Sequence, residues 1–233
     1  MKSYNEIIYD QAYQHENPLS AMIELTCKCN WKCEHCYVEH SHNDVYTLFN
    51  LKKILKVLKL NGIHEIVYIG GEIFTRKDIM DIIQLTRKMY FDVILESNVS
   101  IINEKVIAEL KNAHIKMVSC SLYCLDESIH NDISKTKDSL KQVLLNLELL
   151  KNSGIAVQVK IPLMKKNYDY FEDVILYCRE NNFEVKINSC IFPKISGESV
   201  DDLNITKEEL SDKINLIDQI NTSYFGSEPR NKD

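Results

Sequence analysis

Short apolar runs typical of β-strands alternate along this 233-residue chain with longer runs that have the apolar spacing of amphipathic helices. The expected strands cover residues 21–25, 66–69, 91–95, 115–122, 155–161 and 185–191. The expected helices cover residues 48–60, 78–89, 104–110, 139–150 and 171–179, and a last helix begins at Thr206, where Glu209 completes a capping box. Repeated strand–helix units with short loops predict a parallel sheet with outer helices. A complete (β/α)8 barrel takes about 250 residues and about eight units, so this α/β chain is predicted to form a partial (β/α)6 TIM-like barrel.

Polar side chains interrupt the predicted strands at every second position. Ser119 and Ser121 share a face of one strand, and Gln158 and Lys160 share a face of the next. Parallel strands that are buried on both faces are usually continuous runs of Val, Ile and Leu. The alternation therefore favours a polar interior, whose charges need pairing partners or a polar ligand. In barrels of this kind the functional residues gather at the carboxyl ends of the strands.

Three cysteines follow the first predicted strand with the spacing C-x3-C-x2-C: Cys29, Cys33 and Cys36. Three thiolates this close in sequence can hold three irons of a cubane iron–sulfur cluster, which usually has four cysteine ligands. A fourth cysteine is missing at the expected distance, so one iron would be left open. An open coordination position is where a substrate or cofactor can bind, as at a catalytic zinc.

Two other uses of the cysteines compete with a cluster. Cys27 extends the motif to C-x-C-x3-C-x2-C, and four thiols could form a closed zinc site. Zinc knuckles usually have two C-x2-C pairs, whereas this stretch has one. Disulfides are disfavoured because the polar N-terminus has no signal-peptide apolar region, and the eight cysteines of a chain that is not exported are expected to stay reduced.

Further motifs lie at the ends of the later strands. They are the turn Ile69-Gly70-Gly71-Glu72, the stretch Glu96-Ser97-Asn98, and Ser121-Leu122-Tyr123-Cys124-Leu125-Asp126 with His130. With the cysteines, they resemble the radical S-adenosylmethionine (SAM) superfamily. The pattern is closest to its peptide- and protein-modifying branch, the sulfatase-maturase-like or SPASM type, over roughly residues 21–197.

The resemblance implies that the three cysteines bind a [4Fe–4S] cluster and that SAM chelates the open iron. It also implies cofactor-binding roles for five residues: Tyr37, Gly70, Gly71, Glu72 and Ser121. The glycine-glycine-glutamate turn would meet the SAM ammonium, Tyr37 the adenine, and Ser121 the ribose or carboxylate. Alternatives remain for three of these: Tyr37 as a core aromatic, and Gly70 and Gly71 as a plain strand-to-helix turn. No residue is assigned as a catalytic acid or base.

The activity implied by the resemblance is reductive cleavage of SAM to a 5′-deoxyadenosyl radical that abstracts hydrogen from a substrate. A reduced flavodoxin or ferredoxin is the implied electron donor, and a peptide or protein is the favoured substrate. A glycyl-radical-activating enzyme, a small-molecule enzyme and a non-catalytic zinc or iron–sulfur protein remain alternatives. The chain departs from the family pattern at Ile73, where proline is frequent, and at Tyr123 and Cys124, where Asp-Gly is frequent. It has no cysteine after Cys190, so it either works with one cluster or is a short or truncated form.

Composition narrows the partners and the location. The net charge of −6, without a basic stripe, disfavours nucleic acid. No apolar run approaches the roughly 20 residues that span a bilayer, so a cytoplasmic protein without membrane contact is expected. The predicted organisation is an N-terminal extension (1–20), a radical SAM core (21–200), and a C-terminal helix with a polar tail (201–233).

Overall fold

The computed structural model describes residues 4–38, 44–211 and 213–225. Six parallel strands form one open sheet in the order β1-β2-β3-β4-β5-β6, which confirms the predicted fold class. The strands are β1 (Ser20–Glu24), β2 (Glu65–Ile69), β3 (Asp92–Glu96), β4 (Met117–Ser121), β5 (Val157–Pro162) and β6 (Glu184–Asn188). The α-helices are α1 (Tyr4–Gln14), α2 (Leu48–Leu60), α3 (Ile79–Lys88), α4 (Glu104–Asn112), α5 (Glu127–Ser134), α6 (Ser139–Ser153), α7 (Phe171–Asn181), α8 (Lys207–Leu210) and α9 (Ile214–Phe225). Two 3-10 turns, η1 (Ile73–Thr75) and η2 (Lys165–Asn167), complete the elements.

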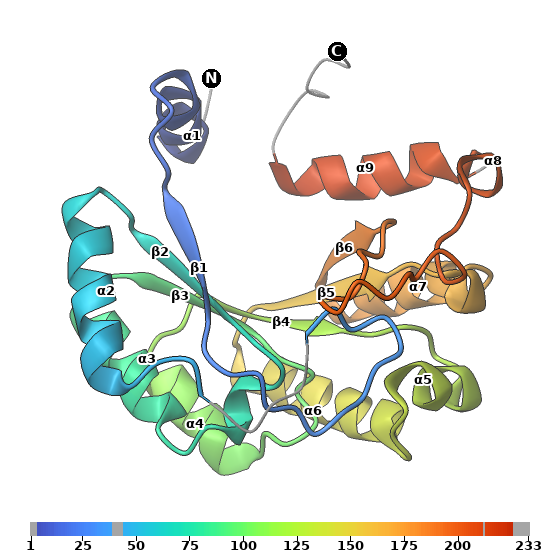
Figure 1. Cartoon of the computed structure of the whole chain (residues 1–233), viewed down its shortest axis with the longest axis horizontal. Coiled ribbons are helices and arrows are strands. Elements are labelled where there is room, and N and C mark those ends of the chain that lie inside the picture. The colour runs from blue at the N-terminus through green and yellow to red at the C-terminus, as the bar shows by residue number, and fades with distance from the viewer. Residues whose placement is uncertain (1–3, 39–43, 212, 226–233) are drawn as a thin grey trace. The chain divides into compact units, whose positions relative to one another are not determined.

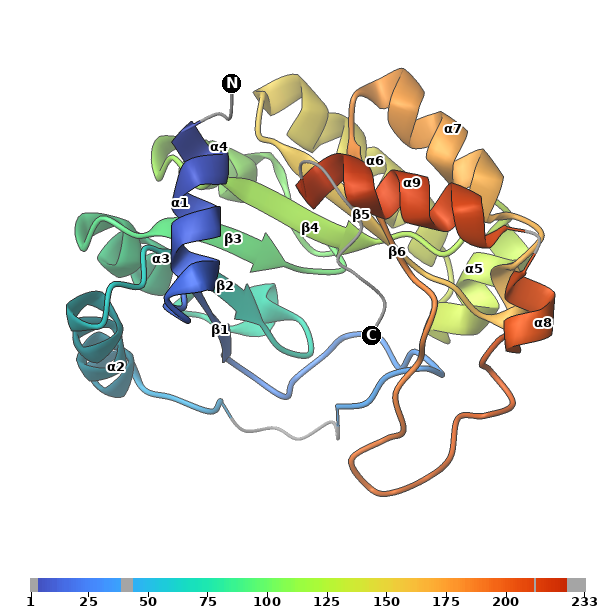
Figure 2. The same cartoon turned by 90° about the horizontal axis from the view of Figure 1, so that it is seen from above.

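The chain divides into two compact units. The first comprises Met1–Trp31, Val38–Cys120 and Gln142–Val157, and the second comprises Lys32–Tyr37, Ser121–Lys141 and Gln158–Asp233. In the first unit β1, β2 and β3 are paired in parallel, and Figure 2 shows β2, β3 and β4 pointing the same way. The helices α2, α3 and α4 lie along one side of β1, β2 and β3 (Figure 1).

Burial alternates along β2 and β3, the two central strands of the first unit. In β2 and in β3 every second residue is buried, and the residues between are half-buried. Leu51 and Leu55 of α2 and Ile82 and Ile83 of α3 are fully buried, as expected for the apolar stripe of a helix that covers a sheet. The predicted alternation therefore appears as one well-buried face and one partly open face.

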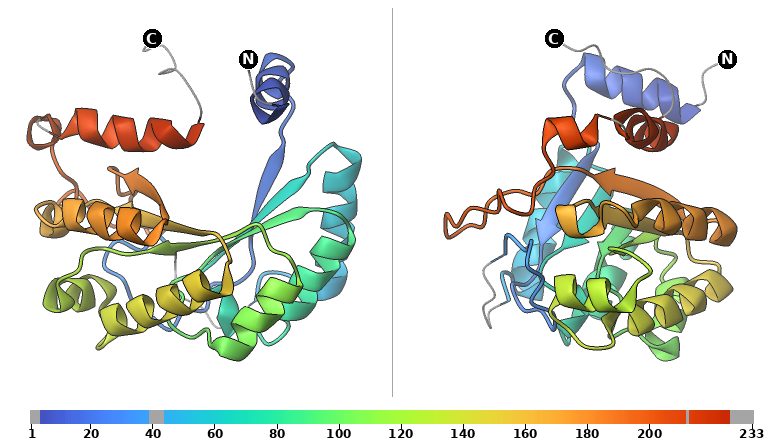
Figure 3. Two further views of the ribbon diagram at one scale, coloured as in Figure 1. Left: turned by 180° about the vertical axis from the view of Figure 1, so that it is seen from behind. Right: turned by 90° about the vertical axis from the view of Figure 1, so that its right-hand side faces the viewer.

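In the second unit β5 and β6 pair in parallel, from Gln158 opposite Glu184 to Pro162 opposite Asn188. The helix α9 runs beside β6 (Figure 3). Asn221 of α9 joins the two elements, because its side chain accepts a hydrogen bond from the Ile187 amide at 3.0 Å and donates one to the Ile187 carbonyl at 3.0 Å. Across both units, none of the helices in the described part of the chain has the length and apolarity to cross a membrane.

Three expectations about secondary structure need correction or extension. The helices α1 and α5 were not predicted. The capping box at Thr206 and Glu209 is present, but α8 is only four residues long and α9 follows it, so the expectation of a single C-terminal helix is wrong. The last part of the predicted C-terminal helix and polar tail (201–233), residues 226–233, lies outside the described residues.

Candidate functional site

Three loops meet at the carboxyl ends of β1, β2 and β3 in the first unit. The strand register pairs Glu24 with Ile69, and Tyr68 with Leu95, so these strands end at one edge of the sheet. The chain leaves this edge as the segment Thr26–Cys29, the turn Gly70–Glu72 and the pair Ser97-Asn98. The predicted cluster ligand Cys29 and the glycine-glycine-glutamate turn thus belong to neighbouring loops.

The two glycines of the turn pack directly on the segment that carries Cys29. The Gly71 amide donates to the Thr26 carbonyl at 2.8 Å, and the Glu72 amide donates to the Lys28 carbonyl at 2.7 Å. A Cβ atom on Gly71 would lie 2.3 Å from the Lys28 carbonyl oxygen, and one on Gly70 would lie 2.4 Å from that of Thr26. Since real Cβ atoms do not approach so closely, glycine is needed at both positions for the two loops to touch.

Glu72 is fully buried and ties this turn to the end of β3. Its carboxylate accepts hydrogen bonds from the Phe74 amide at 3.0 Å, from the Ser97 hydroxyl at 2.9 Å and from the Asn98 amide at 2.7 Å. Burial raises the pKa of Glu72 to about 7, although these three hydrogen bonds lower it. The Glu72 carboxylate therefore joins two loops by hydrogen bonds within the protein. Contact of the Glu72 side chain with SAM stays a prediction.

Cys29 lies among hydrogen-bond donors. Its sulfur accepts from the Trp31 amide at 3.3 Å and from the side-chain amide of Asn98 at 3.9 Å. The Asn98 amide also donates to the side chain of Asn30 at 2.9 Å, and Asn30 donates to the Ser100 hydroxyl at 2.8 Å. Donors around a sulfur favour the thiolate, which is the form that binds metal.

The second unit contains Cys33 and Cys36, and two backbone hydrogen bonds fix their segment to the end of α5. The Lys32 amide donates to the Ser134 carbonyl at 3.3 Å, and the Glu34 amide donates to the Ile133 carbonyl at 3.0 Å. The Cys33 sulfur accepts a hydrogen bond from the Tyr123 hydroxyl at 3.2 Å.

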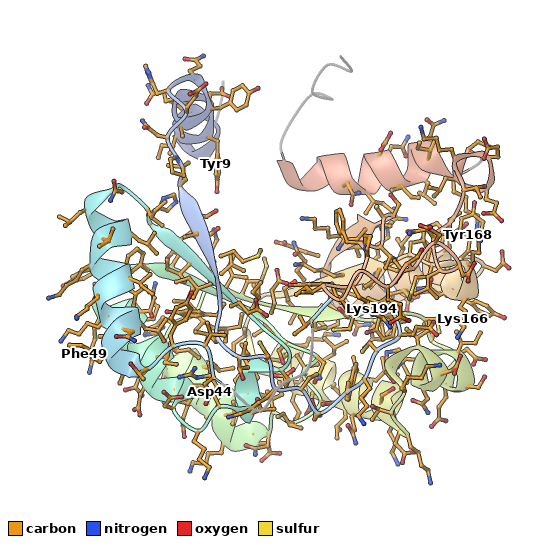
Figure 4. The ribbon with its side chains drawn as sticks, in the orientation of Figure 1. Tyr9, Asp44, Phe49, Lys166, Tyr168 and Lys194 are labelled. Carbon is orange, nitrogen blue, oxygen red and sulfur yellow. The ribbon has the colours of Figure 1, made fainter. Side chains whose placement is uncertain are left out.

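A charged cluster anchors the same segment. Lys166 of η2, labelled in Figure 4, donates to Glu34 at 2.7 Å and to Asp132 at 2.6 Å, and Lys135 lies 3.4 Å from Glu34. Lys135 also donates to Asp132 at 2.7 Å, and the hydrogen bonds from Lys135 and Lys166 lower the pKa of Asp132 to about 2. Glu34 lies between Cys33 and Cys36. The ion pairs of Glu34 with Lys135 and Lys166 therefore help to fix the loop that carries these two cysteines.

The other predicted cofactor contacts lie in the second unit. The side chain of Tyr37 is 44% exposed, and its carbonyl accepts from the Ile195 amide at 3.3 Å, so the alternative of a core aromatic is wrong. Ser121 is the half-buried last residue of β4. Their proposed contacts with adenine and ribose stay predictions.

Two interactions of the site were not assigned from the sequence. The Ser97 and Asn98 donors to Glu72 follow β3, where the family-like stretch Glu96-Ser97-Asn98 was noticed without a role for its side chains. The hydroxyl of Tyr123 donates a hydrogen bond to Cys33, and in the sequence Tyr123 stands out only as a departure from the family pattern. Ser97 directly follows β3 and Tyr123 lies two residues after β4, so a polar side chain near the carboxyl end of a parallel strand is the available signal.

Comparison with known proteins establishes the family. Residues 23–175 match the sequence model of the Radical SAM superfamily, and this chain belongs to that superfamily. Among curated relatives, AlbA of Bacillus subtilis (strain 168), the antilisterial bacteriocin subtilosin biosynthesis protein, is 30% identical over 166 residues, which is 70% of this chain and 37% of AlbA. A GTP 3′,8-cyclase of Clostridium perfringens (strain SM101) is 31% identical over 202 residues, which is 83% of this chain and 50% of the cyclase.

Solved structures agree on the fold. Streptococcus suis SuiB bound to S-adenosylmethionine superposes with a TM-score of 0.73 at 17% identity, covering 93% of this chain and 50% of SuiB. SuiB bound to its precursor peptide SuiA superposes with a TM-score of 0.71 at 17% identity, covering 93% of this chain and 48% of SuiB. The chain spans about half or less of the length of these relatives.

The family uses [4Fe–4S] clusters, and cysteine thiolates are the ligands that such clusters take in proteins. Among residues 4–38, 44–211 and 213–225, no group of three or more Cys, His, Asp or Glu side chains is placed to hold a metal ion. Cys29 and Cys33 both accept hydrogen bonds at sulfur, from an amide in one case and from a phenol in the other. Hydrogen bonds to sulfur are among the features that tune protein-bound iron–sulfur clusters.

Proposed function

We propose that this chain is a radical SAM enzyme that acts on a peptide or protein substrate. The observation that carries the proposal is the motif Cys29, Cys33 and Cys36 in a chain of this superfamily, with hydrogen-bond donors on two of its sulfurs. A [4Fe–4S] cluster held by these three cysteines would supply one-electron reduction of SAM, the chemistry that leads to hydrogen abstraction from a substrate.

The residues of the chain then have the following roles. Cys29, Cys33 and Cys36 hold the cluster. Gly70 and Gly71 are half-buried and place the Cys29 segment against their turn, and the turn itself would meet the SAM ammonium. Glu72 positions the turn by accepting hydrogen bonds from Ser97 and Asn98. This role is additional to the predicted contact of Glu72 with SAM.

A peptide substrate is supported by the relatives. AlbA is a bacteriocin biosynthesis protein, and SuiB has been solved with a precursor peptide. A small-molecule substrate is the second candidate, because GTP 3′,8-cyclases reach 31% identity to this chain. Transfer of deuterium from a labelled substrate into 5′-deoxyadenosine distinguishes the two, with labelled GTP on one side and labelled candidate peptides on the other.

The class of enzyme is tested by anaerobic reconstitution with iron and sulfide. We expect a brown protein with about four irons per chain, and formation of methionine and 5′-deoxyadenosine when dithionite or reduced flavodoxin and SAM are added. Cys190→Ala, which removes an exposed cysteine outside the motif, is the matched control and should behave like the wild type. A colourless protein that takes up zinc and no iron or sulfide would refute the proposal and favour the closed zinc site with Cys27.

A further inference from the structure

The hydroxyl of Tyr123 is directed at a predicted cluster ligand. It donates a hydrogen bond to the sulfur of Cys33, with 3.2 Å between oxygen and sulfur. Tyr123 follows β4, at a position where the family-like pattern has an acidic residue. Tyr123 is only 2% exposed, whereas Cys33 is half-buried, so the bond between them is partly buried. A hydrogen bond that is partly shielded from water is electrostatically stronger than one in bulk water.

The second unit holds the ring of Tyr123 from several sides. Its carbonyl accepts a hydrogen bond at 2.8 Å from the side chain of Asn167, which is itself fully buried. Its ring meets His35 edge-on at 5.3 Å between centroids, and it meets His130 at 4.9 Å with the planes tilted by 45°. His35 lies in the loop between Cys33 and Cys36. The ring is therefore locked against this loop, and the hydroxyl is preorganised on the sulfur of Cys33.

We propose that Tyr123 tunes the iron–sulfur cluster by donating a hydrogen bond to the ligand sulfur of Cys33. This inference rests on the proposed function, because it requires a cluster on Cys33. A bond from a neutral donor to a thiolate strengthens as negative charge on the sulfur grows. The reduced cluster has one more electron than the oxidised one, so the bond stabilises the reduced state more and raises the reduction potential. Tyr123 is thus a tuning residue that acts through Cys33.

The test is Tyr123→Phe, which keeps the aromatic ring and removes only the hydroxyl. We expect the reconstituted variant to keep the iron content of the wild type. At a fixed potential near the midpoint, its ratio of reduced to oxidised cluster should fall by about tenfold, a shift of about 59 mV to more negative potential for a one-electron couple. A redox titration followed by electron paramagnetic resonance measures this shift.

Tyr68→Phe is the matched control. Tyr68 is another fully buried tyrosine, and its hydroxyl bonds to Thr86 at 2.5 Å instead of to a cysteine. We expect this control to lose stability without a change in midpoint potential. A second readout is the Fe–S(Cys) stretching band in resonance Raman spectra, which should move between H2O and D2O in the wild type and move less in Tyr123→Phe.

The outcomes separate this inference from the proposed function. If the wild type binds no cluster, the proposed function fails and the inference fails with it. If the wild type and Tyr123→Phe both bind about four irons with equal midpoint potentials, the inference alone is wrong. It is also wrong if the folded variant loses iron, because the hydroxyl would then be needed for ligation and not for tuning.

Discussion

Glu72→Gln tests whether the buried carboxyl group of Glu72 stabilises the protein by hydrogen-bonding two loops to each other. The wild-type carboxylate accepts from the Phe74 amide, the Ser97 hydroxyl and the Asn98 amide. Glutamine is nearly the same size, but its amide nitrogen cannot accept a hydrogen bond. The Ser97 hydroxyl can rotate and accept from that nitrogen, whereas a backbone amide cannot. One buried N–H therefore loses its partner, which costs about 1–3 kcal/mol.

The pH dependence gives the sharper signature. Burial raises the pKa of Glu72 from 4.5 to about 7, so between these values the folded state binds more protons at this group than the unfolded state. The stability that comes from this group is fully present below pH 4.5 and is lost as the pH rises through 7. At roughly 1.4 kcal/mol per pH unit, the loss amounts to about 3 kcal/mol. Glutamine does not titrate and lacks this loss.

Urea unfolding of the cluster-free protein at pH 5 and pH 8, followed by circular dichroism, measures both effects. We expect Glu72→Gln to be less stable than the wild type at pH 5, and this deficit should shrink or reverse at pH 8. Glu148→Gln, which changes an exposed side chain of α6, is the matched control and should stay within about 0.5 kcal/mol of the wild type at both pH values. An equal difference between wild type and Glu72→Gln at the two pH values would refute the reasoning.

The remaining predictions concern the cysteine loop. Cys33→Ala should lose the cluster and all SAM cleavage, whereas Cys27→Ala should keep both; iron counting and visible absorbance decide this, and loss of the cluster in Cys27→Ala would contradict the ligand assignment. Gly71→Ala should displace the Lys28 carbonyl, reduce iron uptake and destabilise the protein by about 1–3 kcal/mol, because overpacking a tight contact costs this much. A Gly71→Ala protein with wild-type stability and iron content would show that the contact relaxes freely.

The strands and most helices were predictable because their residues repeat with clear periods. All six strands fall within a few residues of their predicted bounds. The strand predicted to reach Ile191 ends at Asn188 instead. There the side chain of Asn204 takes over both backbone bonds of Ile191, accepting from its amide at 2.8 Å and donating to its carbonyl at 2.9 Å. Such a replacement of a strand partner by a side chain leaves no periodic signal in the sequence.

The unpredicted helices have weaker signals of a different kind. In α5, Asp126 caps the start by accepting from the Ile129 amide at 3.0 Å, and Lys135 ends the helix in the left-handed conformation. An aspartate at this position is a usual sign of a helix start, but residues 121–126 stand out in the sequence only as a family-like motif. Among the described side chains of α1 there is no buried apolar face to mark it as a helix, because its apolar residues Ile7, Tyr9 and Tyr13 are exposed.

The motifs of the candidate site were readable from the sequence, whereas the contacts that these motifs make were not. The C-x3-C-x2-C spacing and the paired glycines are local patterns, and each can be read without knowing what lies opposite. The parallel register of β1, β2 and β3 brings Gly71 against Lys28 and brings Glu72 within hydrogen-bond distance of Ser97. That register joins segments far apart in the chain, with Glu72 and Ser97 separated by 25 residues, and no short motif encodes it. Contact between two loops is therefore sufficient to require glycine at positions 70 and 71. A ligand that binds this edge of the first unit would meet loops whose positions these contacts already fix.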